Sequence, residues 1–409
     1  MSSRKRRILY IQSFPGGGSA VSLYELVRSL DTRFYTPIIL FYTESGYRKQ
    51  FEALGANVIT LSTQFLCPTS VGIQTPLSLR AQRYGAWLRY AGRMIKPLYQ
   101  VLCQDWPLAR CIARLIRAES VDLVHHNNNL PVNRAAVIAA CLTNTPQICH
   151  VRWFNNLSYI DSCLARFVKA FIYNSKAVAA CYHSQGIAAY KGQVVYNPIN
   201  VEAFAQSADI GTIRAEFGLT MSDIVVSNIG LLASWKGQDY FLQALAQVIH
   251  IVPQIKSLIV GKPASDPHEK QFSERLQQLV SSLGLSDHVI FTGFREDIPR
   301  LMTASDIIVH SASEPEPFGR VIVEAMAAGK PVIATASGGV LEIIEQMIDG
   351  LLVPPKNADA MATAILHLLN HPEEARILAQ QGQQRVGKRF SVWQHVAAIQ
   401  HIYQHVLER

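Results

Sequence analysis

The chain has 409 residues, enough for two domains that each bury a core of their own. A hydrophobic content of 49% with 17% charged residues excludes a disordered chain, and no apolar run approaches the roughly 18 residues of a membrane-spanning helix. The net charge of +8 is unevenly spread, since residues 1–200 carry an excess of basic residues and residues 201–409 a smaller excess of acidic ones. This asymmetry predicts two domains with different partners.

All seven cysteines lie in the first half of the chain, and none of them forms a Cys-x-x-Cys pair. The basic residues at 4–7 precede an apolar run that is too short for a signal peptide. Both features predict a cytoplasmic protein with reduced thiols. We interpret His125-His126 as the end of a strand, because no carboxylate or cysteine lies at a metal-binding spacing from it. We therefore expect no metal and no cofactor.

The first 198 residues read as alternating strands and helices. A strand at 8–11, a glycine-rich loop at 12–18 and a helix at 19–30 form the beginning that is typical of a Rossmann-like domain. Further strands are expected at 36–42, 57–61, 121–125, 146–151, 170–173 and 193–196. His150 lies near the end of one of them, where open α/β sheets bind ligands, so it is a candidate site residue.

Residues 66–118 are rich in arginine and aromatic residues and contain one acidic residue, Asp105. A helix with a basic face and an aromatic face suits an anionic membrane surface or a lipid-linked acceptor, which we favour. The first alternative is a helical insert packed on its own domain. The second is nucleic-acid binding, which we disfavour because the chain shows no recognised binding motif.

The pattern of strands and helices restarts after residue 198. Strands are expected at 223–230, 256–261, 288–292, 306–310, 331–335 and 351–353, and helices include 269–283 and 340–347. Two strand–helix alternations of this length predict two doubly wound domains with a cleft between the carboxyl ends of their sheets.

The segment 313–330 is the richest candidate site. Two prolines break the chain after the strand at 306–310, and a helix is expected from Gly319 to Gly329. Amides at a helix start bind anions, and Glu316 and Glu324 add two carboxylates at the same place. These groups suit a ligand with phosphate and hydroxyl groups, such as a sugar nucleotide. On spacing alone, two unrelated surface glutamates remain the alternative.

Taken together, these residues resemble the retaining GT-B glycosyltransferases of family 4, or glycosyl transferases group 1, over nearly the whole chain. The segment from Glu316 to Glu324 looks like the E-x7-E motif of that family. The resemblance implies an α/β GT-B fold with two Rossmann-like doubly wound domains facing across a cleft. It assigns 1–198 to an acceptor-side domain, 199–386 to a nucleotide-sugar-binding domain, and 387–409 to a helix that crosses back to the first domain. The other matching residues are Lys236-Gly237, Gly338-Gly339 with Glu342, Asn174-Ser175 and Asn197-Pro-Ile-Asn200.

The resemblance also implies the activity and the roles of the residues. A sugar would move, with retention, from a UDP- or GDP-sugar to a glycan or lipid-linked acceptor in cell-surface polysaccharide or glycolipid synthesis. His150 and Glu316 would be the catalytic residues at the reacting sugar. Lys236 would bind the diphosphate, and Glu324 the ribose. The full implied donor-binding set is Gly17, Gly18, Lys236, Phe294, Arg295, Phe318, Gly319, Arg320, Val321, Glu324, Gly338 and Gly339.

One position departs from the family pattern. Leu231 stands where the family often has an arginine on the diphosphate, so phosphate binding would depend on Lys236, on helix starts, or on Arg152 or Arg320. No Asp-x-Asp metal motif is present. The alternative functions are a nucleotide-sugar epimerase of GT-B fold and a non-catalytic nucleotide-sugar binding protein. For the transferase we expect a cytoplasmic location, peripheral on the inner face of the membrane, and no nucleic-acid partner.

Overall fold

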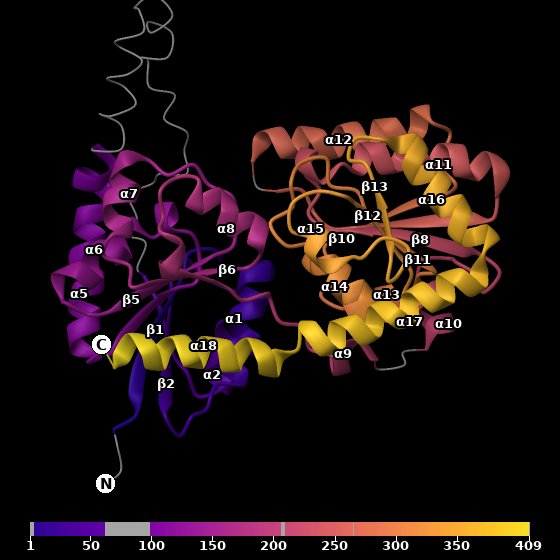
Figure 1. Ribbon diagram of the computed structural model, residues 1–409. Coiled ribbons are helices and arrows are strands. Elements are labelled where there is room, and N and C mark those ends of the chain that lie inside the picture. The colour runs from indigo at the N-terminus through magenta and orange to yellow at the C-terminus, as the bar shows by residue number, and fades with distance from the viewer. Residues whose placement is uncertain (1–3, 62–98, 206–208, 265, 409) are drawn as a thin grey trace, which may run out of the picture. The chain divides into compact units, whose positions relative to one another are not determined.

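The computed structural model describes residues 4–61, 99–205, 209–264 and 266–408 (Figure 1). The chain forms two compact units, Met1–Tyr196 with His395–Arg409, and Asn197–Gln394. The last helix, α18 (Val392–Leu407), therefore begins in the second unit and has the rest of its residues in the first.

The first unit is built on a parallel seven-stranded sheet with the order β3-β2-β1-β4-β5-β6-β7. Its strands are nearly continuous apolar runs, because a parallel sheet is covered by helices on both faces. The strand order reverses between β1 and β4, which makes this point the switch where open α/β sheets bind ligands. The strands are β1 (Arg6–Gln12), β2 (Tyr35–Phe41), β3 (Asn57–Thr60), β4 (Leu123–His126), β5 (Gln147–Val151), β6 (Ala170–Tyr173) and β7 (Gly192–Val194).

Helices cover both faces of this sheet. On one face, Leu9 and Ile38 pack with residues of α5 and α6. On the other, Phe41 packs on Phe51 of α2, and the Tyr10 hydroxyl accepts a hydrogen bond from Tyr403 of α18. The helices of this unit are α1 (Gly18–Arg28), α2 (Arg48–Ala53), α5 (Trp106–Ala118), α6 (Arg134–Leu142), α7 (Tyr159–Ala165) and α8 (Lys176–His183), with short helical turns at Val101–Asp105, Leu130–Val132 and Ala189–Lys191.

Most of the predicted basic segment 66–118 lies outside the described residues, but its end is α5. This helix buries Ile112 and Ile116 against the sheet and exposes arginines on its other side. In this part of the segment the apolar face is therefore a core face of the first unit. Among the helices that the structure describes, none combines the length and the apolar character needed to cross a membrane. The exposed arginines of α5 are Arg110, Arg114 and Arg117.

The second unit contains a parallel six-stranded sheet with the order β10-β9-β8-β11-β12-β13. One core cluster joins the sheet to α11, α12 and α16, and another joins it to α10 and α13 (Figure 1). The strands are β8 (Ile224–Ile229), β9 (Ile255–Val260), β10 (Val289–Gly293), β11 (Ile307–His310), β12 (Val332–Thr335) and β13 (Leu351–Val353). The helices are α9 (Val201–Ala205), α10 (Ile210–Glu216), α11 (Gln238–Ile251), α12 (Pro267–Ser282), α13 (Ile298–Ala304), α14 (Arg320–Ala327), α15 (Val340–Ile343), α16 (Ala358–Asn370) and α17 (Pro372–Arg389).

The helix predicted at 340–347 is too long. α15 ends at Ile343, and a tight turn follows in which Met347 has a φ of 61°. The side chain of Asp349 stabilises this turn by accepting a hydrogen bond from the amide of Glu345 at 2.8 Å. The apolar spacing continues past Ile343, but the local side-chain bond to the backbone competes with the helix.

Candidate functional site

Glu316 is the centre of the candidate site in the second unit. It follows β11 in a loop bounded by Pro315 and Pro317, and it is 7% exposed. Its Oε2 accepts a 2.6 Å hydrogen bond from Nζ of Lys236 and lies 3.3 Å from Nε2 of His310, the last residue of β11. A buried carboxylate is thus held by one ammonium group and one imidazole at the carboxyl end of the parallel sheet.

These partners keep Glu316 ionised. Burial alone would raise the pKa of Glu316, but the charge of Lys236 and the hydrogen bond from His310 outweigh it and lower that pKa to about 2. An ionised carboxylate only accepts hydrogen bonds, so its remaining lone pairs are suited to hydroxyl groups of a ligand. Lys236 has three N–H donors and spends one of them on Glu316.

Lys236 reaches this position through a short 3₁₀ turn, Ser234–Lys236, that precedes α11. The next residue, Gly237, has a φ of 65°, and a Cβ there would lie 2.2 Å from the carbonyl oxygen of Ser311. The hydroxyl of Ser311 donates to the Lys236 carbonyl at 2.9 Å, and the amide of Ser313 donates to the Trp235 carbonyl at 2.9 Å. Only glycine permits this close contact. The Lys236-Gly237 pair therefore packs the loop before α11 directly against the loop that follows β11.

The helix α14 begins three residues after the buried glutamate. Its N-cap is Gly319, with a φ of 98°, and Arg320 and Val321 lie in its first turn. Amides in the first turn of a helix favour anions, because the helix dipole is positive at this end. Glu324 lies one turn later and accepts a 2.7 Å hydrogen bond from Nε of Arg320, whose Nη1 also donates to the carbonyl of Pro198 at 3.1 Å. Burial raises the pKa of Glu324, and Arg320 opposes this shift.

Phe318 belongs to the core beside this helix. Its ring is 3% exposed and packs edge-on against Phe390 at 5.8 Å. Of the predicted donor-binding residues at 318–321, Phe318 therefore has its ring buried in the core.

Gly338 and Gly339 lie directly against the backbone of the Glu316 loop. A Cβ on Gly338 would approach the Glu316 carbonyl oxygen to 2.3 Å, and one on Gly339 would approach the Pro317 carbonyl oxygen to 2.5 Å. The amide of Gly339 donates to the Glu316 carbonyl at 2.8 Å. The structure thus gives the glycine pair a packing role, because it lets the loop after β12 lie beside the glutamate.

Phe294 and Arg295, predicted to hold the nucleotide base, follow β10. The Phe294 ring is 59% exposed, with Nζ of Lys262 4.7 Å from its centroid. Arg295 is occupied by two carboxylates, since its Nε and Nη2 each donate to Asp297 at 2.8 Å and its Nη1 donates to Glu216. These hydrogen bonds raise the pKa of Arg295. The exposed group next to Phe294 is therefore not Arg295 but Lys262, whose ammonium group lies over the Phe294 ring.

In the first unit, asparagines join the loops at the carboxyl end of the sheet. Gly17 has a φ of 82° and caps α1, which starts at Gly18. Asn127, directly after β4, donates to Gln12 at 2.6 Å and accepts a 2.7 Å hydrogen bond from Nη2 of Arg152. Asn127 therefore joins the end of β1 to the residue that follows β5, at the switch point of this sheet.

His150 lies inside β5 and is fully buried. Its ring is stacked between His125, at 5.6 Å, and His395 of α18, at 5.8 Å. Burial, followed by the charge of Arg152, lowers the pKa of His150 well below its ordinary value, so the imidazole is neutral. Its Nδ1 lies 3.2 Å from Nη2 of Arg152, while its Nε2 has no hydrogen-bond partner among the described residues.

Sequence reasoning missed three residues that shape these two sites: His310, Lys262 and Asn127. His310 was recognised as the end of a strand and Asn127 follows another strand, so both carry the positional signal that singled out His150. Lys262 could not be found in this way, because its partner Phe294 is distant in sequence.

Leu231, at the position where a cation was expected, is 38% exposed. Its carbonyl accepts a 2.9 Å hydrogen bond from Gln238 in the first turn of α11. Neighbouring glycines bring two loops together here, since a Cβ on Gly261 would lie 1.8 Å from the Gly230 carbonyl oxygen. In the sequence, Lys236 comes shortly after Gly230 and Lys262 directly after Gly261.

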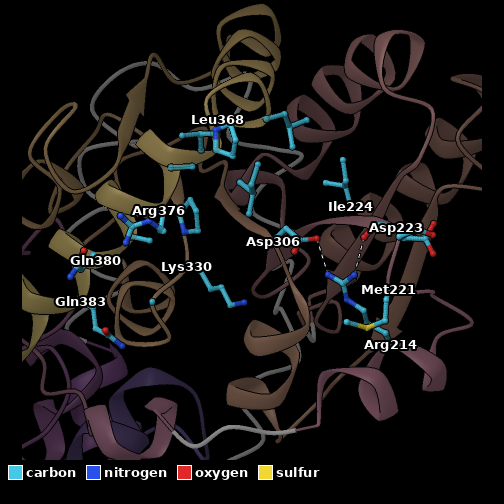
Figure 2. Close-up of a pocket in the computed structure, with 18 residues that line it drawn as sticks. Arg214, Met221, Asp223, Ile224, Asp306, Lys330, Leu368, Arg376, Gln380 and Gln383 are labelled. Carbon is cyan, nitrogen blue, oxygen red and sulfur yellow. Dashed lines mark hydrogen bonds and ion pairs between the residues drawn. The ribbon is translucent and has the colours of Figure 1, made fainter.

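A hollow of about 640 Å³ lies at the opposite end of the same sheet, where the strands begin (Figure 2). Ile224 and Ile307 line it at the amino ends of β8 and β11, and Arg214 pairs there with Asp306 at 2.8 Å. Gly329 and Lys330, at the end of the predicted segment 313–330, line this hollow, but none of the residues predicted to be catalytic or to bind the donor does. It is therefore separate from the candidate site at the carboxyl ends of the strands.

The chain matches two family models, one in each half of the sequence. The family model "Glycosyl transferases group 1" matches residues 209–385, and the model "Glycosyltransferase Family 4" matches residues 16–203. N-acetyl-alpha-D-glucosaminyl L-malate synthase of Bacillus anthracis is 27% identical over 320 residues, which are 76% of this chain and 81% of that protein.

Among solved structures, Anabaena Alr3699/HepE in complex with UDP and glucose has a TM-score of 0.81 at 26% identity and covers 98% of this chain and 100% of that chain. The same protein in complex with UDP-glucose has a TM-score of 0.79 at 26% identity, covering 98% and 99% of the two chains.

Proposed function

Because the chain belongs to the family-4, group 1 glycosyltransferases and has their GT-B fold, we propose that it transfers a hexose from a nucleotide sugar with retention of configuration. The UDP and UDP-glucose bound by the Anabaena relative support a UDP-sugar donor. For the acceptor we propose a glycan or a lipid-linked glycan of the cell surface.

The observation that carries the proposal is the contact of Lys236 and His310 with the buried Glu316. A retaining transfer develops positive charge at the sugar ring and negative charge on the departing diphosphate. In our proposal the Glu316 carboxylate accepts hydrogen bonds from the sugar hydroxyls. The two other N–H groups of Lys236, together with the first-turn amides of α14, bind the diphosphate.

Glu324 completes the donor half of the site. Arg320 orients this carboxylate through a 2.7 Å hydrogen bond, and a carboxylate fixed in this way suits the two adjacent hydroxyls of a ribose. The exposed Phe294 ring and Lys262 offer a stacking surface for the base. Fixed cations and amides thus supply the electrostatic stabilisation, and the proposal requires no metal.

We assign His150 of the first unit to the reacting sugar. Its imidazole is neutral and its Nε2 has no partner among the described residues, so this atom is suited to a hydrogen bond with a sugar hydroxyl. The basic segment that begins at residue 66 is our candidate for the acceptor side. With it we propose a cytoplasmic enzyme that is peripheral on the inner membrane face.

The proposal is tested by incubating the protein with UDP- and GDP-sugars, with and without membrane lipid extract, and by measuring release of the nucleoside diphosphate. We expect release to depend on the extract or on an added glycan, and the linkage of the product, determined by NMR, to keep the anomeric configuration of the donor. Nucleotide release that never depends on an acceptor would contradict the transferase. Interconversion of the nucleotide sugar itself would instead identify an epimerase.

A further inference from the structure

His367, His371 and Glu374 form a side-chain cluster where α16 ends and α17 begins. Each offers one nitrogen or oxygen atom, and these three atoms all lie within 4.8 Å of one another. His367 lies in the last turn of α16, His371 is the residue between the helices, and Glu374 is in the first turn of α17. The cluster belongs to the second unit, and none of its members takes part in the candidate donor site.

From this geometry we propose a binding site for a divalent transition metal, with zinc as the best match. Imidazole and carboxylate ligands suit Zn²⁺, whereas Mg²⁺ and Ca²⁺ prefer sites made of oxygen atoms. Two histidines and one glutamate supply three protein ligands, and water completes a tetrahedral shell. From the sequence we expected no metal, because neither the cysteines nor His125-His126 form a ligand set at metal-binding spacing.

The separations fit such a shell. Ligand atoms about 2.1 Å from a tetrahedral zinc lie roughly 3.4 Å from one another. Nε2 of His367 and Oε2 of Glu374 are already 3.0 Å apart, and the two imidazole rings have their centroids at 4.5 Å. Two of the three ligand atoms are therefore already near the separation that a shared zinc ion requires, and the third, on the exposed His371, lies within 4.8 Å of both.

The hydrogen bond of His371 selects the tautomer that a metal requires. Nδ1 of His371 lies 2.8 Å from the carbonyl oxygen of His367, and a carbonyl oxygen can only accept, so Nδ1 carries the proton. Nε2 of His371 is then left with its lone pair. In metal-binding histidines, the ring nitrogen that does not bind the metal typically donates such a hydrogen bond to a carbonyl or carboxylate oxygen.

The proposed ion would cross-link the two helices. It would join the end of α16 to the first turn of α17, and α17 in turn binds the end of α14 through Gln383, whose Nε2 donates to the Ala327 carbonyl at 3.0 Å. A metal ion binds neutral imidazole and ionised carboxylate, so protons compete with it and its affinity should fall on acidification.

The test uses the full chain without a polyhistidine tag, titrated with ZnCl₂ in a calorimeter, and with CoCl₂ as a spectroscopic probe. We expect one equivalent of Zn²⁺ to bind, a Co²⁺ spectrum of four-coordinate type, and a rise in Tm with Zn²⁺ but not with Mg²⁺. His371→Ala and Glu374→Gln should each weaken Zn²⁺ binding by about tenfold or more.

The matched control is His268→Ala, which removes an exposed histidine of the same unit and should bind Zn²⁺ like the unchanged chain. The Glu374→Gln variant keeps the shape of the side chain, so its fold can be verified by its Tm without metal. Absence of stoichiometric binding, or equal binding by the unchanged chain and both cluster variants, would overturn the proposal. Because donor binding is measured separately with UDP, this result is independent of the proposed transferase.

Discussion

Nζ of Lys236 lies 2.6 Å from Oε2 of Glu316 and 4.2 Å from the centroid of the Trp235 ring. The two charged residues come from loops that follow different strands, β8 and β11, which are neighbours in the sheet. A buried carboxylate without a partner would be strongly destabilising, so each group depends on the other. The contact therefore serves both the stability of the second unit and the proposed binding of a donor.

Replacing Lys236 by alanine should weaken the binding of UDP. A charge-assisted hydrogen bond contributes about 1.5–3 kcal/mol, so we expect a loss of about 10- to 100-fold in affinity, measured by calorimetry. Lys388→Ala removes an exposed lysine from α17 and should leave the affinity unchanged. If both Lys236→Ala and Glu324→Ala bind UDP like the unchanged protein, the site is assigned wrongly.

Glu324→Ala should weaken UDP binding because it removes the proposed acceptor for the ribose hydroxyls. The comparison with 2′,3′-dideoxy-UDP isolates this contact, since that ligand lacks both hydroxyls. We expect the unchanged protein to bind UDP more tightly than the dideoxy compound, and the Glu324→Ala variant to bind the two alike. A variant that still distinguishes them would show that other residues contact the ribose.

Glu316 should make the stability of the protein depend on pH in the acidic range. Its pKa is about 2 in the folded chain against an ordinary value of 4.5, so the ionised group stabilises the fold above about pH 4.5. This contribution, up to about 3 kcal/mol, is lost as the pH falls toward 2.

The Glu316→Gln variant lacks this titration. Denaturant unfolding of both proteins at several pH values should give a free-energy difference that is largest near neutral pH and narrows below pH 4.5. All other carboxyl groups are shared by the two proteins and largely cancel in the difference. A gap that does not change with pH would contradict the low pKa of Glu316.

Gly338→Ala should destabilise the second unit and abolish transfer. The added Cβ meets the Glu316 carbonyl oxygen at 2.3 Å, and the φ of 61° is itself unfavourable for alanine, so a loss of at least about 1–3 kcal/mol is expected. Gly387→Ala in α17 is the control, because an added Cβ there meets nothing within 4 Å beyond the adjacent residues and backbone of its own helix, and alanine favours a helix by about 1 kcal/mol. Thermal unfolding should give a lower Tm for the first variant and an unchanged or higher Tm for the second.

Much of the architecture could be predicted from local patterns. The short apolar runs at 8–11 and 306–310 are strands in the structure, because buried parallel strands read as continuous apolar segments. The loop with Glu316 and the start of α14 at Arg320 follow from proline and glycine positions. The end of α15 was missed, since the Asp349 side chain competes with the helix after Ile343.

The sequence by itself determined the two-sheet α/β architecture and the motif from Glu316 to Glu324, since both depend on spacing along the chain. Only the tertiary structure decided which charges meet. The fold brings Lys236 to Glu316 and Glu216 to Arg295, and the residues of each pair are far apart in the sequence.

The same holds for the packing around these charges. The glycine pair at 338–339 is pressed against the Glu316 loop, and His150 is enclosed between two other histidines. Such contacts depend on how distant segments approach each other in space, and no local pattern of residues encodes that distance.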